Sequence, residues 1–388
     1  MKHGWEIKKL GEVFDLQMGK TPSRDNADYW GGSNVWISIA DLKNKYIGES
    51  KEYITDKAVA DSKIKRINSG VVIMSFKLTV GRAAITTTDV YTNEAIMAFN
   101  LKEGYDLLPD YIYYYLRGYK WSGTNKAVMG LTLNKATISE NIIAIPPLSV
   151  QSKIVLELDG INGILEKKRE QIKELDALAQ SIFYDMFGDP IQNEKGWEVK
   201  RLGDVCSIIG GYAFKSELFK ENGIPVLRIG NINTGQLRIT PIVYYKEDSN
   251  LEKYLVYPRD LVMSLTGTVG KDDYGNVCIL DNTFSKYYLN QRNAKFTLSE
   301  CILVDYLKYF LQNKEIKSQL VGVNRGVRQG TIANRDIERL PIPLPPLPLQ
   351  QAFAAKIEAI EKQKELVKRS IAETETLLAS RIQHYFEA

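Results

Sequence analysis

Residues 4–13 read GWEIKKLGEV and residues 196–205 read GWEVKRLGDV, so one ten-residue stretch occurs twice, 192 positions apart. The correspondence continues, because Ser75–Gly81 matches Ser264–Gly270. A period near 195 residues is far longer than the roughly 20 to 50 residues of solenoid repeats. The sequence therefore predicts a duplicated domain. Two such domains related by a pseudo-two-fold axis suit a target with the same symmetry, and duplex DNA is such a target.

Each half ends in a proline pair followed by a long helical pattern. Pro146-Pro147-Leu148 with Gln151 matches Pro345-Pro346-Leu347 with Gln350. The prolines fix where each helix can begin, since they favour extended structure before it. Beyond them, residues spaced alternately three and four apart predict the seam of a coiled coil. The predicted seam consists of Leu158, Ile161, Leu165, Ile172, Leu175 and Ile182 in the first copy, and of Ile357, Ile360, Val367, Ile371 and Leu378 in the second.

Over roughly 35 residues at about 1.5 Å each, these helices would reach on the order of 50 Å, which is long enough for a spacer. The same three-and-four spacing also places a lysine in the seam of each helix. Lys168 corresponds to Val367 in the other copy, and Lys364 corresponds to Leu165. We expect the two helices to pack on each other, with the lysines snorkelling or fixing the register. The alternative is that each helix packs only on its own domain, and contact between the two helices distinguishes these arrangements.

The globular segments carry the pattern of a mixed α/β fold. Short runs of β-branched residues, such as those at Val71–Met74 and Leu261–Met263, lie between Gly, Asn, Pro and Asp turn signals. A helix with stacked aromatic residues interrupts the strands at Tyr111–Leu116 and again at Tyr306–Leu311. We therefore expect two α/β segments, each with small sheets and helices and each followed by a long helix.

Composition bounds the class of protein. The chain has 388 residues, 44% of them hydrophobic and 25% charged, which is enough for two globular domains. It has no 18-residue apolar run and no N-terminal signal pattern, so we expect a soluble cytoplasmic protein without membrane contact. The formal net charge is +4, and the excess lies in residues 1–150 and 188–347, each with three more basic than acidic residues. Such a weak excess permits nucleic-acid binding without establishing it.

Cysteine and histidine usage excludes several kinds of site. Cys206, Cys278 and Cys301 have no paired ligand spacing and are predicted to be buried small hydrophobes. The two histidines, His3 and His384, lie at the extreme ends of the chain. Neither a His-based nucleophile triad nor a His-rich metal site can be assembled from them.

Motifs that would make the chain an enzyme are incomplete. Gly19-Lys20-Thr21 resembles the end of a phosphate-binding loop, but the glycine needed five residues earlier is Phe14. No G-x-G-x-x-G fingerprint follows a predicted strand. The two Pro-Pro-Leu segments lack the polar residue and the aromatic ring that an amino-methyltransferase uses on a flipped base. Asp159, Glu166 and Lys168 fall on a predicted helix surface, so we expect no self-sufficient active site and no metal site.

The loops of both halves are rich in residues that contact DNA. Arg and Lys bind phosphates, and Arg, Lys, Asn, Gln, Ser and Thr read base edges. These loops differ between the halves more than the framework does, which predicts two different half-sites on one scaffold. Trp5 and Trp197 belong to that framework and are expected in the core. The predicted DNA-binding residues are Lys20, Thr21, Ser23, Arg24, Lys77, Thr79, Arg82, Lys126 and Lys135 in the first half, and Lys215, Arg228, Asn231, Asn233, Thr266, Thr268, Lys271, Arg292, Arg325, Arg328 and Gln329 in the second.

Together these residues resemble the specificity subunits of Type I restriction-modification systems, and the resemblance covers essentially the whole chain. It rests on the two Gly-Trp…Leu-Gly-[Glu/Asp]-Val openings, on Gly19–Ser23, and on the doubled proline segments with a Gln before a long helix. The first proline segment, at Ala144–Gln151, is shorter than the usual run, whereas Pro341–Leu347 is fuller. Each string is weak alone, and their duplicated order makes the match specific.

The resemblance implies a pseudo-two-fold symmetric subunit whose two target-recognition domains are separated by two long antiparallel coiled-coil helices. Residues 1–150 and 188–347 would be the recognition domains, and residues 151–187 and 348–388 the spacer helices. Such a subunit reads a bipartite DNA site and has no catalytic activity of its own. It recruits two methyltransferase subunits that bring S-adenosylmethionine and, for restriction, two translocase/nuclease subunits that use ATP and Mg. No cofactor is expected on this chain.

Two other classes of function stay open at this point. A stand-alone DNA-modifying enzyme with an unrecognised site would turn over S-adenosylmethionine or cleave DNA by itself. A protein-binding adaptor would use the coiled coil and have no DNA role. Salt-dependent DNA association of the reconstituted complex argues against an adaptor, because phosphate contacts release counterions.

Overall fold

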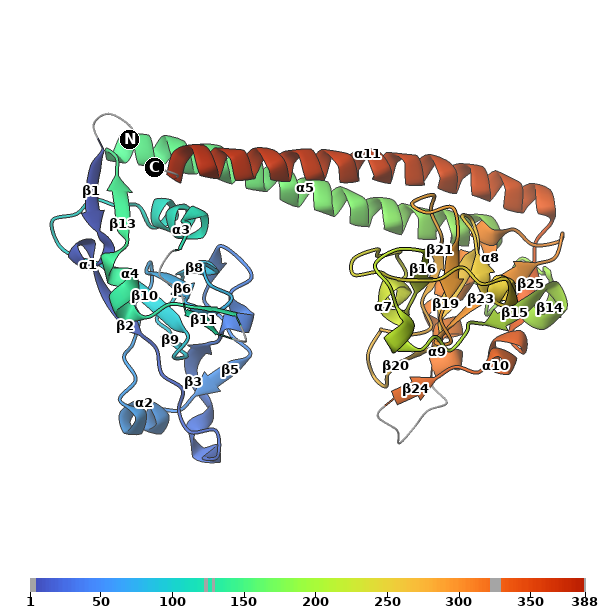
Figure 1. Ribbon diagram of the computed structural model, residues 1–388, viewed down its shortest axis with the longest axis horizontal. Helices are drawn as coiled ribbons and strands as arrows, with labels where there is room; N and C mark the ends of the chain where they lie inside the picture. The colour runs from blue at the N-terminus through green and yellow to red at the C-terminus, as the bar shows by residue number, and fades with distance from the viewer. Residues whose placement is uncertain (1–4, 122–124, 128–129, 322–328, 387–388) are drawn as a thin grey trace. The chain divides into compact units, whose positions relative to one another are not determined.

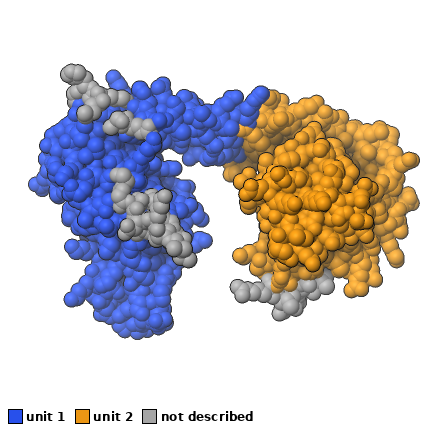
Figure 2. Space-filling model, viewed as in Figure 1, with its two compact units in different colours: residues 1–169, 369–388 blue, residues 170–368 orange. Residues whose placement is uncertain are grey.

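The computed structural model describes residues 5–121, 125–127, 130–321 and 329–386. The chain forms two compact units, shown in blue and orange in Figure 2. Unit 1 comprises residues 1–169 and 369–388, and unit 2 comprises residues 170–368. Each unit therefore contains one globular segment together with parts of both long helices. The predicted division places each long helix in a segment of its own instead.

The described residues of unit 1 form four small sheets (Figure 1). One has five strands in the order β2-β10-β6-β8-β4, two have three strands in the orders β5-β3-β9 and β11-β12-β7, and the last is the pair β1-β13. The helix α3 (Pro109–Gly118) and the short helices α1 (Leu10–Val13), α2 (Asp56–Ser62) and α4 (Lys135–Glu140) accompany them. The strands are β1 (Glu6–Lys9), β2 (Phe14–Met18), β3 (Trp30–Ile37), β4 (Tyr46–Ile47), β5 (Glu52–Ile54), β6 (Val72–Ser75), β7 (Lys77–Leu78), β8 (Ala83–Thr86), β9 (Tyr91–Thr92), β10 (Ile96–Leu101), β11 (Asn125–Ala127), β12 (Gly130–Thr132) and β13 (Ile142–Ile145).

The described residues of unit 2 also form four sheets, namely two four-stranded sheets, β15-β23-β19-β21 and β17-β16-β22-β18, and the pairs β14-β25 and β20-β24. Its helices are α6 (Leu202–Val205), α7 (Ile229–Ile232), α8 (Val304–Gln312), α9 (Lys314–Val321) and α10 (Asn334–Glu338). The strands are β14 (Glu198–Arg201), β15 (Cys206–Gly210), β16 (Ile224–Leu227), β17 (Val243–Tyr245), β18 (Leu255–Val256), β19 (Leu261–Ser264), β20 (Thr266–Thr268), β21 (Val277–Ile279), β22 (Tyr287–Leu289), β23 (Asn293–Leu298), β24 (Gln329–Thr331) and β25 (Pro341–Leu344). The predicted mixed α/β fold with small sheets, in two copies, is confirmed.

A buried glutamine fastens the start of each long helix in the same way. The Gln151 side chain donates to the Asp106 and Pro146 carbonyls at 2.8 Å and accepts from the Leu108 amide at 2.9 Å. Gln350 makes the equivalent bonds, donating to the Cys301 and Pro345 carbonyls and accepting from the Leu303 amide. Both side chains are fully buried, so each glutamine satisfies backbone groups that water cannot reach. This is the physical role of the glutamine that follows each proline pair.

The long helices α5 (Leu148–Phe187) and α11 (Leu347–Phe386) begin directly after the proline pairs, as predicted. In unit 1, Glu157 near the start of α5 accepts a hydrogen bond from Tyr385 near the end of α11, at 2.5 Å. In unit 2, Asp176 of α5 pairs with Lys364 of α11 at 2.7 Å. The two helices thus run antiparallel and touch within each unit, and the alternative of two separate helices is excluded. All the predicted seam residues are buried or half-buried.

The polar seam positions have partners across the helix pair. Lys168 Nζ donates to the Ser370 hydroxyl at 2.5 Å. Lys364 is 6% exposed, and its ammonium pairs with both Asp176 and Glu361. A buried cation with two carboxylates tolerates little sliding of one helix along the other, so these residues fix the register.

The core of each unit combines its globular segment with both long helices. In unit 2, Phe183 and Phe187 of α5 and Phe353 of α11 pack around Tyr306 of α8. In unit 1, Phe386 at the end of α11 packs against Tyr111 and Tyr115 of α3, with ring centroids 5.6 and 5.4 Å apart. In each unit, the long helices therefore pack against the globular segment through its aromatic helix, α3 in unit 1 and α8 in unit 2.

The three cysteines differ in burial. Cys206 and Cys278 are buried, as predicted, but Cys301 is exposed, so the prediction of burial is wrong for Cys301. Cys301 follows strand β23 in a surface turn, where its thiol lies 3.1 Å from the Ser299 hydroxyl.

Trp5 and Trp197, which are expected in the hydrophobic core, are half-buried instead of fully buried. The Trp197 indole donates to the Phe187 carbonyl at 2.8 Å and so ties the second globular segment to the end of α5.

Within the described ranges, no helix combines the length and the apolar character that crossing a bilayer requires. Among the same residues, no group of three or more His, Cys, Asp or Glu side chains is placed to hold a metal ion.

Candidate nucleic-acid interface

Two adjoining cavities in unit 2 bring together most of the predicted DNA-binding residues of the second half. They measure ≈ 450 Å³ and ≈ 530 Å³, and both are lined by Ile229 and Arg292. We call them together the polar cleft. Figure 1 shows α7, β20 and β24, which contribute to its walls, on the same side of unit 2. Its polar lining residues are Arg228, Asn231, Asn290, Gln291 and Arg292 in one cavity, and Asn233, Thr266, Thr268, Lys271, Asp273, Arg292 and Gln329 in the other.

The turn at the start of α7 positions Arg228 at the cleft. The Asn231 side chain accepts from the Arg228 amide at 2.9 Å and donates to the Arg238 and Pro241 carbonyls. Asn231 is 3% exposed, and these bonds occupy its amide. It therefore shapes the turn, and its two N–H groups and one acceptor position are taken up by the backbone.

Hydrogen-bonding groups in the cleft are left without protein partners. The Arg228 Nε and the Thr266 hydroxyl are buried and form no hydrogen bond with the described residues. The Arg228 guanidinium lies 5.9 Å from the centre of the Phe219 ring. Because a buried polar group without a partner costs free energy, these two atoms indicate a site that a polar ligand completes.

Arg292 projects from a rigid turn between β22 and β23. Its amide donates to Asn290 Oδ1 at 3.4 Å, and its carbonyl accepts from the Leu265 amide at 2.8 Å. The side chain is exposed and forms no ion pair with a residue that the structure describes. Lys271 and Gln329 are also exposed at the cleft, and Asp273 is held there by the Thr268 amide at 2.8 Å. The cleft thus offers two arginines, a lysine, hydroxyls and amides, the set that contacts phosphates and base edges.

In unit 1, the predicted residues of the loop after β2 have protein partners. Lys20 Nζ donates to the Ser62 carbonyl at 2.7 Å, and the Thr21 hydroxyl donates to Glu94. Arg24 forms a two-pronged ion pair with Glu52 and lies 3.8 Å from the centre of the Trp30 ring. The hydrogen bond and charge of Glu52 raise the pKa of Arg24, and the hydrogen bond from Arg24 holds the pKa of Glu52 below its usual range.

The other first-half candidates are more open. Thr79, Arg82 and Lys135 are exposed, and the half-buried Lys77 lies 5.4 Å from the Phe76 ring centre. Ser23 serves the fold through its carbonyl, which accepts from the Trp30 indole at 3.1 Å. In the second half, Lys215 is exposed but lines neither cavity of the polar cleft. The side chain of Lys126 and the whole of Arg325 and Arg328 lie outside the described residues.

Gly19 has a structural role in the backbone packing of unit 1. A Cβ at Gly19 would overlap the carbonyl oxygens of Thr92 and Asn93, and a Cβ at Gly211 would overlap those of Leu289 and Asn290. Both glycines allow the strand that carries them to pass close to the turn before the next strand. The repeated glycine is therefore required by the close packing of the backbone at this turn in each unit.

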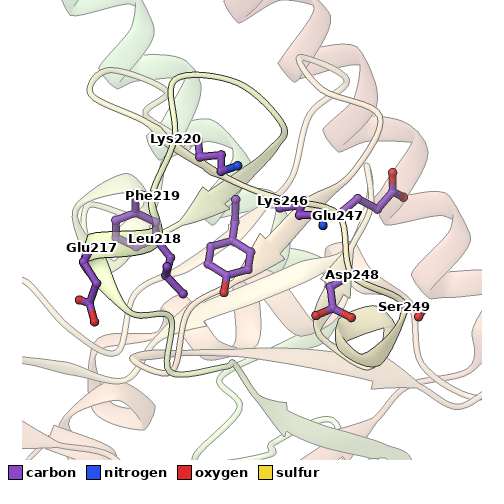
Figure 3. Close-up of a pocket in the computed structure, with 9 residues that line it drawn as sticks. Glu217, Leu218, Phe219, Lys220, Lys246, Glu247, Asp248 and Ser249 are labelled. Carbon is purple, nitrogen blue, oxygen red and sulfur yellow. The ribbon is translucent and has the colours of Figure 1, made fainter.

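A larger cavity in unit 2, ≈ 580 Å³, differs from the polar cleft in charge (Figure 3). Figure 3 shows the carboxylates of Glu217, Glu247 and Asp248 around it, with Lys220 and Lys246. Asp248 accepts from the Asn250 amide and caps the following short helix, and Glu247 pairs with Lys286. Its three carboxylates are balanced by Lys220, Lys246 and the Lys286 that pairs with Glu247, so this cavity lacks the excess of positive charge that attracts a phosphate backbone.

Comparison with known proteins identifies the class. The family model for the Type I restriction modification DNA specificity domain matches residues 2–175 and again residues 194–376. The chain therefore belongs to the family of Type I restriction-modification specificity subunits, whose role is DNA sequence recognition. It is not itself an enzyme, since in this family the methyltransferase activity belongs to partner subunits.

Particular relatives agree along nearly the whole chain. The MjaIX specificity subunit of Methanocaldococcus jannaschii is 26% identical, covering 92% of this chain and 86% of the relative. The MjaVIII specificity subunit of the same organism is 24% identical over 94% and 88%. A solved structure described as showing complex assembly and conformational transition of the type I R-M system has a TM-score of 0.62 at 18% identity, covering 100% of this chain and 98% of that one. The S subunit of M. genitalium has a TM-score of 0.50 at 12% identity, with the same coverage.

Sequence reasoning missed Glu94, Asp273 and the aromatic wall formed by Phe214 and Phe219. These residues are acidic or aromatic, whereas the predicted DNA contacts are all basic or neutral polar residues. An alignment of the two halves at Asn93 and Asn290 would have placed Glu94 opposite Gln291.

Proposed function

We propose that this specificity subunit reads a bipartite DNA site, with residues 188–347 reading one half-site through the polar cleft and residues 1–150 reading a different one. The observation that carries the proposal is the pair of buried, unpartnered groups at Arg228 and Thr266 beside the exposed Arg292. Arginine recognises guanine with two parallel hydrogen bonds, and glutamine recognises adenine in the same way. The cleft therefore has the chemistry to select bases and to hold the backbone beside them.

The helices α5 and α11 would set the distance between the half-sites. Each has 40 residues, and the paired lysines in their seam fix the register of one against the other. A rigid spacer makes the length of unread DNA part of the target. Half-sites centred about one helical turn, ~10 bp or ~34 Å apart, would suit reading from one face of the duplex.

We also propose that two methyltransferase subunits bind the helix pair. Leu178 of α5 and Leu377 of α11 occupy equivalent repeat positions, and both are 48% exposed. A leucine exposed at the same place in each unit suits two copies of one partner. Translocase and nuclease subunits would join the same assembly for restriction.

The experiment that tests the proposed function is mapping of methylated adenines in DNA from cells that carry this chain and its methyltransferase. A single interrupted motif with a fixed gap is the expected result. A continuous motif, or methylation without sequence preference, would contradict the bipartite reading. Incubation of the pure chain with DNA, metal and S-adenosylmethionine should give no turnover.

Binding measurements test the DNA role independently of methylation. The reconstituted complex should bind duplex DNA with an affinity that falls as salt rises, because each phosphate contact releases counterions. Salt-independent association would instead favour a protein-binding adaptor.

A further inference from the structure

The turns that precede β10 in unit 1 and β23 in unit 2 are held by the same set of backbone hydrogen bonds. The Asn93 amide donates to the Ile37 carbonyl at 3.0 Å, and the Asn290 amide donates to the Leu227 carbonyl at 3.1 Å. Two residues after each asparagine, a second backbone bond is shared. The Phe76 amide donates to the Ala95 carbonyl in unit 1, and the Leu265 amide donates to the Arg292 carbonyl in unit 2.

The incoming strands are fastened to these turns alike. The Gly19 amide donates to the Ile96 carbonyl at 3.1 Å, and the Gly211 amide to the Asn293 carbonyl at 3.0 Å. In addition, Asn93 Oδ1 accepts from the Ala95 amide, and Asn290 Oδ1 from the Arg292 amide. The two turns are therefore one frame built twice, in which Glu94 stands where Gln291 does and Ala95 stands where Arg292 does.

In unit 2 the outward residues of this frame, Gln291 and Arg292, line the polar cleft. The equivalent position in unit 1 carries an exposed carboxylate, Glu94. Thr21 donates its hydroxyl to Glu94, and this bond, together with the charges of Lys77 and Arg24, holds the pKa of Glu94 below its usual range despite partial burial. Glu94 is thus ionised and oriented at neutral pH.

An ionised carboxylate on a DNA-binding face repels phosphates and can only accept hydrogen bonds. Thr21 occupies one of about four acceptor positions, so the remainder are available to a ligand. In the major groove, the donors that a carboxylate can meet are the amino groups of cytosine N4 and adenine N6. We propose that Glu94 is a specificity-determining residue of unit 1 that accepts a hydrogen bond from such an exocyclic amino group, at the frame position from which Gln291 and Arg292 read the other half-site.

This inference rests on the proposed function, and Glu94→Gln in the complete methyltransferase complex tests it. The readout is binding to duplexes in which each base pair of each half-site is changed in turn. We expect the preference at one base pair of a single half-site to fall by about 10-fold, as the loss of one good base contact predicts. The other half-site should be read as in the wild type, which shows that the variant is folded and assembled. The base pair that loses its preference distinguishes cytosine from adenine.

One control variant sharpens the result. Glu103→Gln removes the same charge from an exposed position outside the frame and should leave both half-sites unchanged.

The outcomes separate the two ideas. A wild-type complex that shows no half-site preference at all refutes the proposed function. A wild-type complex with two half-sites, together with a Glu94→Gln complex that has the same preferences and affinity at every base pair, overturns the role of Glu94. A uniform gain in affinity for all sequences would also overturn it, because that is the signature of lost phosphate repulsion alone.

Discussion

Arg292 is the more exposed of the two arginines of the polar cleft, and its backbone amide and carbonyl are both hydrogen-bonded. We predict that Arg292→Ala weakens binding to one half-site by about 1–3 kcal/mol and relaxes its preference at one base pair. Competition binding with duplexes altered in each half-site measures this. Lys215→Ala is the matched control, because Lys215 is an exposed cation of the same unit that lines neither cavity. Equal effects of the two variants would mean that charge alone matters.

Asn231 predicts a different kind of defect. Its buried amide satisfies one backbone amide and two carbonyls, so Asn231→Ala should lower the free energy of unfolding of unit 2 by about 1–3 kcal/mol. Thermal melting of the purified chain measures the loss. A variant with wild-type melting and a changed DNA preference would show that Asn231 contacts DNA after all.

Residue types in loops could be predicted from sequence, but their partners could not. Lys20, Thr21 and Arg24 look like free donors in a polar loop, yet they bind Ser62, Glu94 and Glu52, which are 28 to 73 positions away in the sequence. In unit 2 the prediction placed Arg228, Thr266 and Arg292 on loops, and the fold brings those loops to one cleft. Sequence alone cannot show which loop charges neutralise each other, because that depends on strand register.

At the scale of elements, the buried glutamines Gln151 and Gln350 stabilise the starts of the long helices, and this contribution can be measured. Gln350→Leu keeps the volume but leaves the Leu303 amide and the Cys301 and Pro345 carbonyls without a partner. We expect a loss of about 1–3 kcal/mol for each unsatisfied group that stays dry. Thermal melting of Gln350→Leu should therefore show a large loss, and Gln151→Leu should show a similar one in unit 1. An exposed glutamine of the same helix, such as Gln363, changed to Leu serves as the control.

The ion cluster between α5 and α11 gives a prediction about pH. Burial raises the pKa of Glu361, but the hydrogen bond from Lys364 and the charges of Lys308 and Lys364 outweigh it, so the net pKa is lowered. A carboxyl group whose pKa is lower in the folded protein than in the unfolded chain stabilises the fold at pH values above the unfolded pKa, which is near 4.5. This stabilisation is lost as the pH falls through the folded pKa. The melting temperature of wild type should exceed that of Glu361→Gln at pH 7, and the difference should vanish once the pH has fallen through the lowered pKa of Glu361. A constant difference from pH 7 to pH 3 would contradict this assignment.

Elements could be predicted well where a pattern is periodic or repeated. The proline pairs, the three-and-four spacing and the aromatic helices predicted α5, α11, α3 and α8 correctly. The short strands β4, β7 and β9, of two residues each, have no such signal, because tertiary pairing alone defines them. The exposure of Cys301 was missed for the same reason, since a surface turn and a buried strand end look alike over a few residues.

For the whole molecule, the completion of each core by a distant helix end has a measurable effect. Phe386 is 7% exposed against Tyr111 and Tyr115, although more than 270 positions separate them in the sequence. We predict that Phe386→Ala destabilises unit 1 by about 3–5 kcal/mol, as for other buried aromatic residues. Hydrogen exchange of α3 and α8, measured in one sample, should show faster exchange in α3 only. Phe187→Ala should give the reverse pattern.

Removal of residues 348–388 should be more severe than either point change. It takes Phe353, Ile357 and Ile360 from the core of unit 2 and Phe386 from that of unit 1. We expect methyltransferase recruitment to be abolished or halved, as measured by the mass of the reconstituted complex. An assembly of normal stoichiometry would refute the role proposed for the helix pair.

The close approach at Gly19 and Gly211 has an evolutionary consequence. Any larger residue there would collide with the neighbouring backbone, whereas Glu94 in unit 1 and Gln291 and Arg292 in unit 2 are exposed on the corresponding turns. Substitutions are therefore tolerated at the exposed positions and excluded at the glycines beneath them. A lineage of such proteins can acquire a new half-site sequence by exchanging one or two side chains on one unit, while the other unit continues to bind its original half-site.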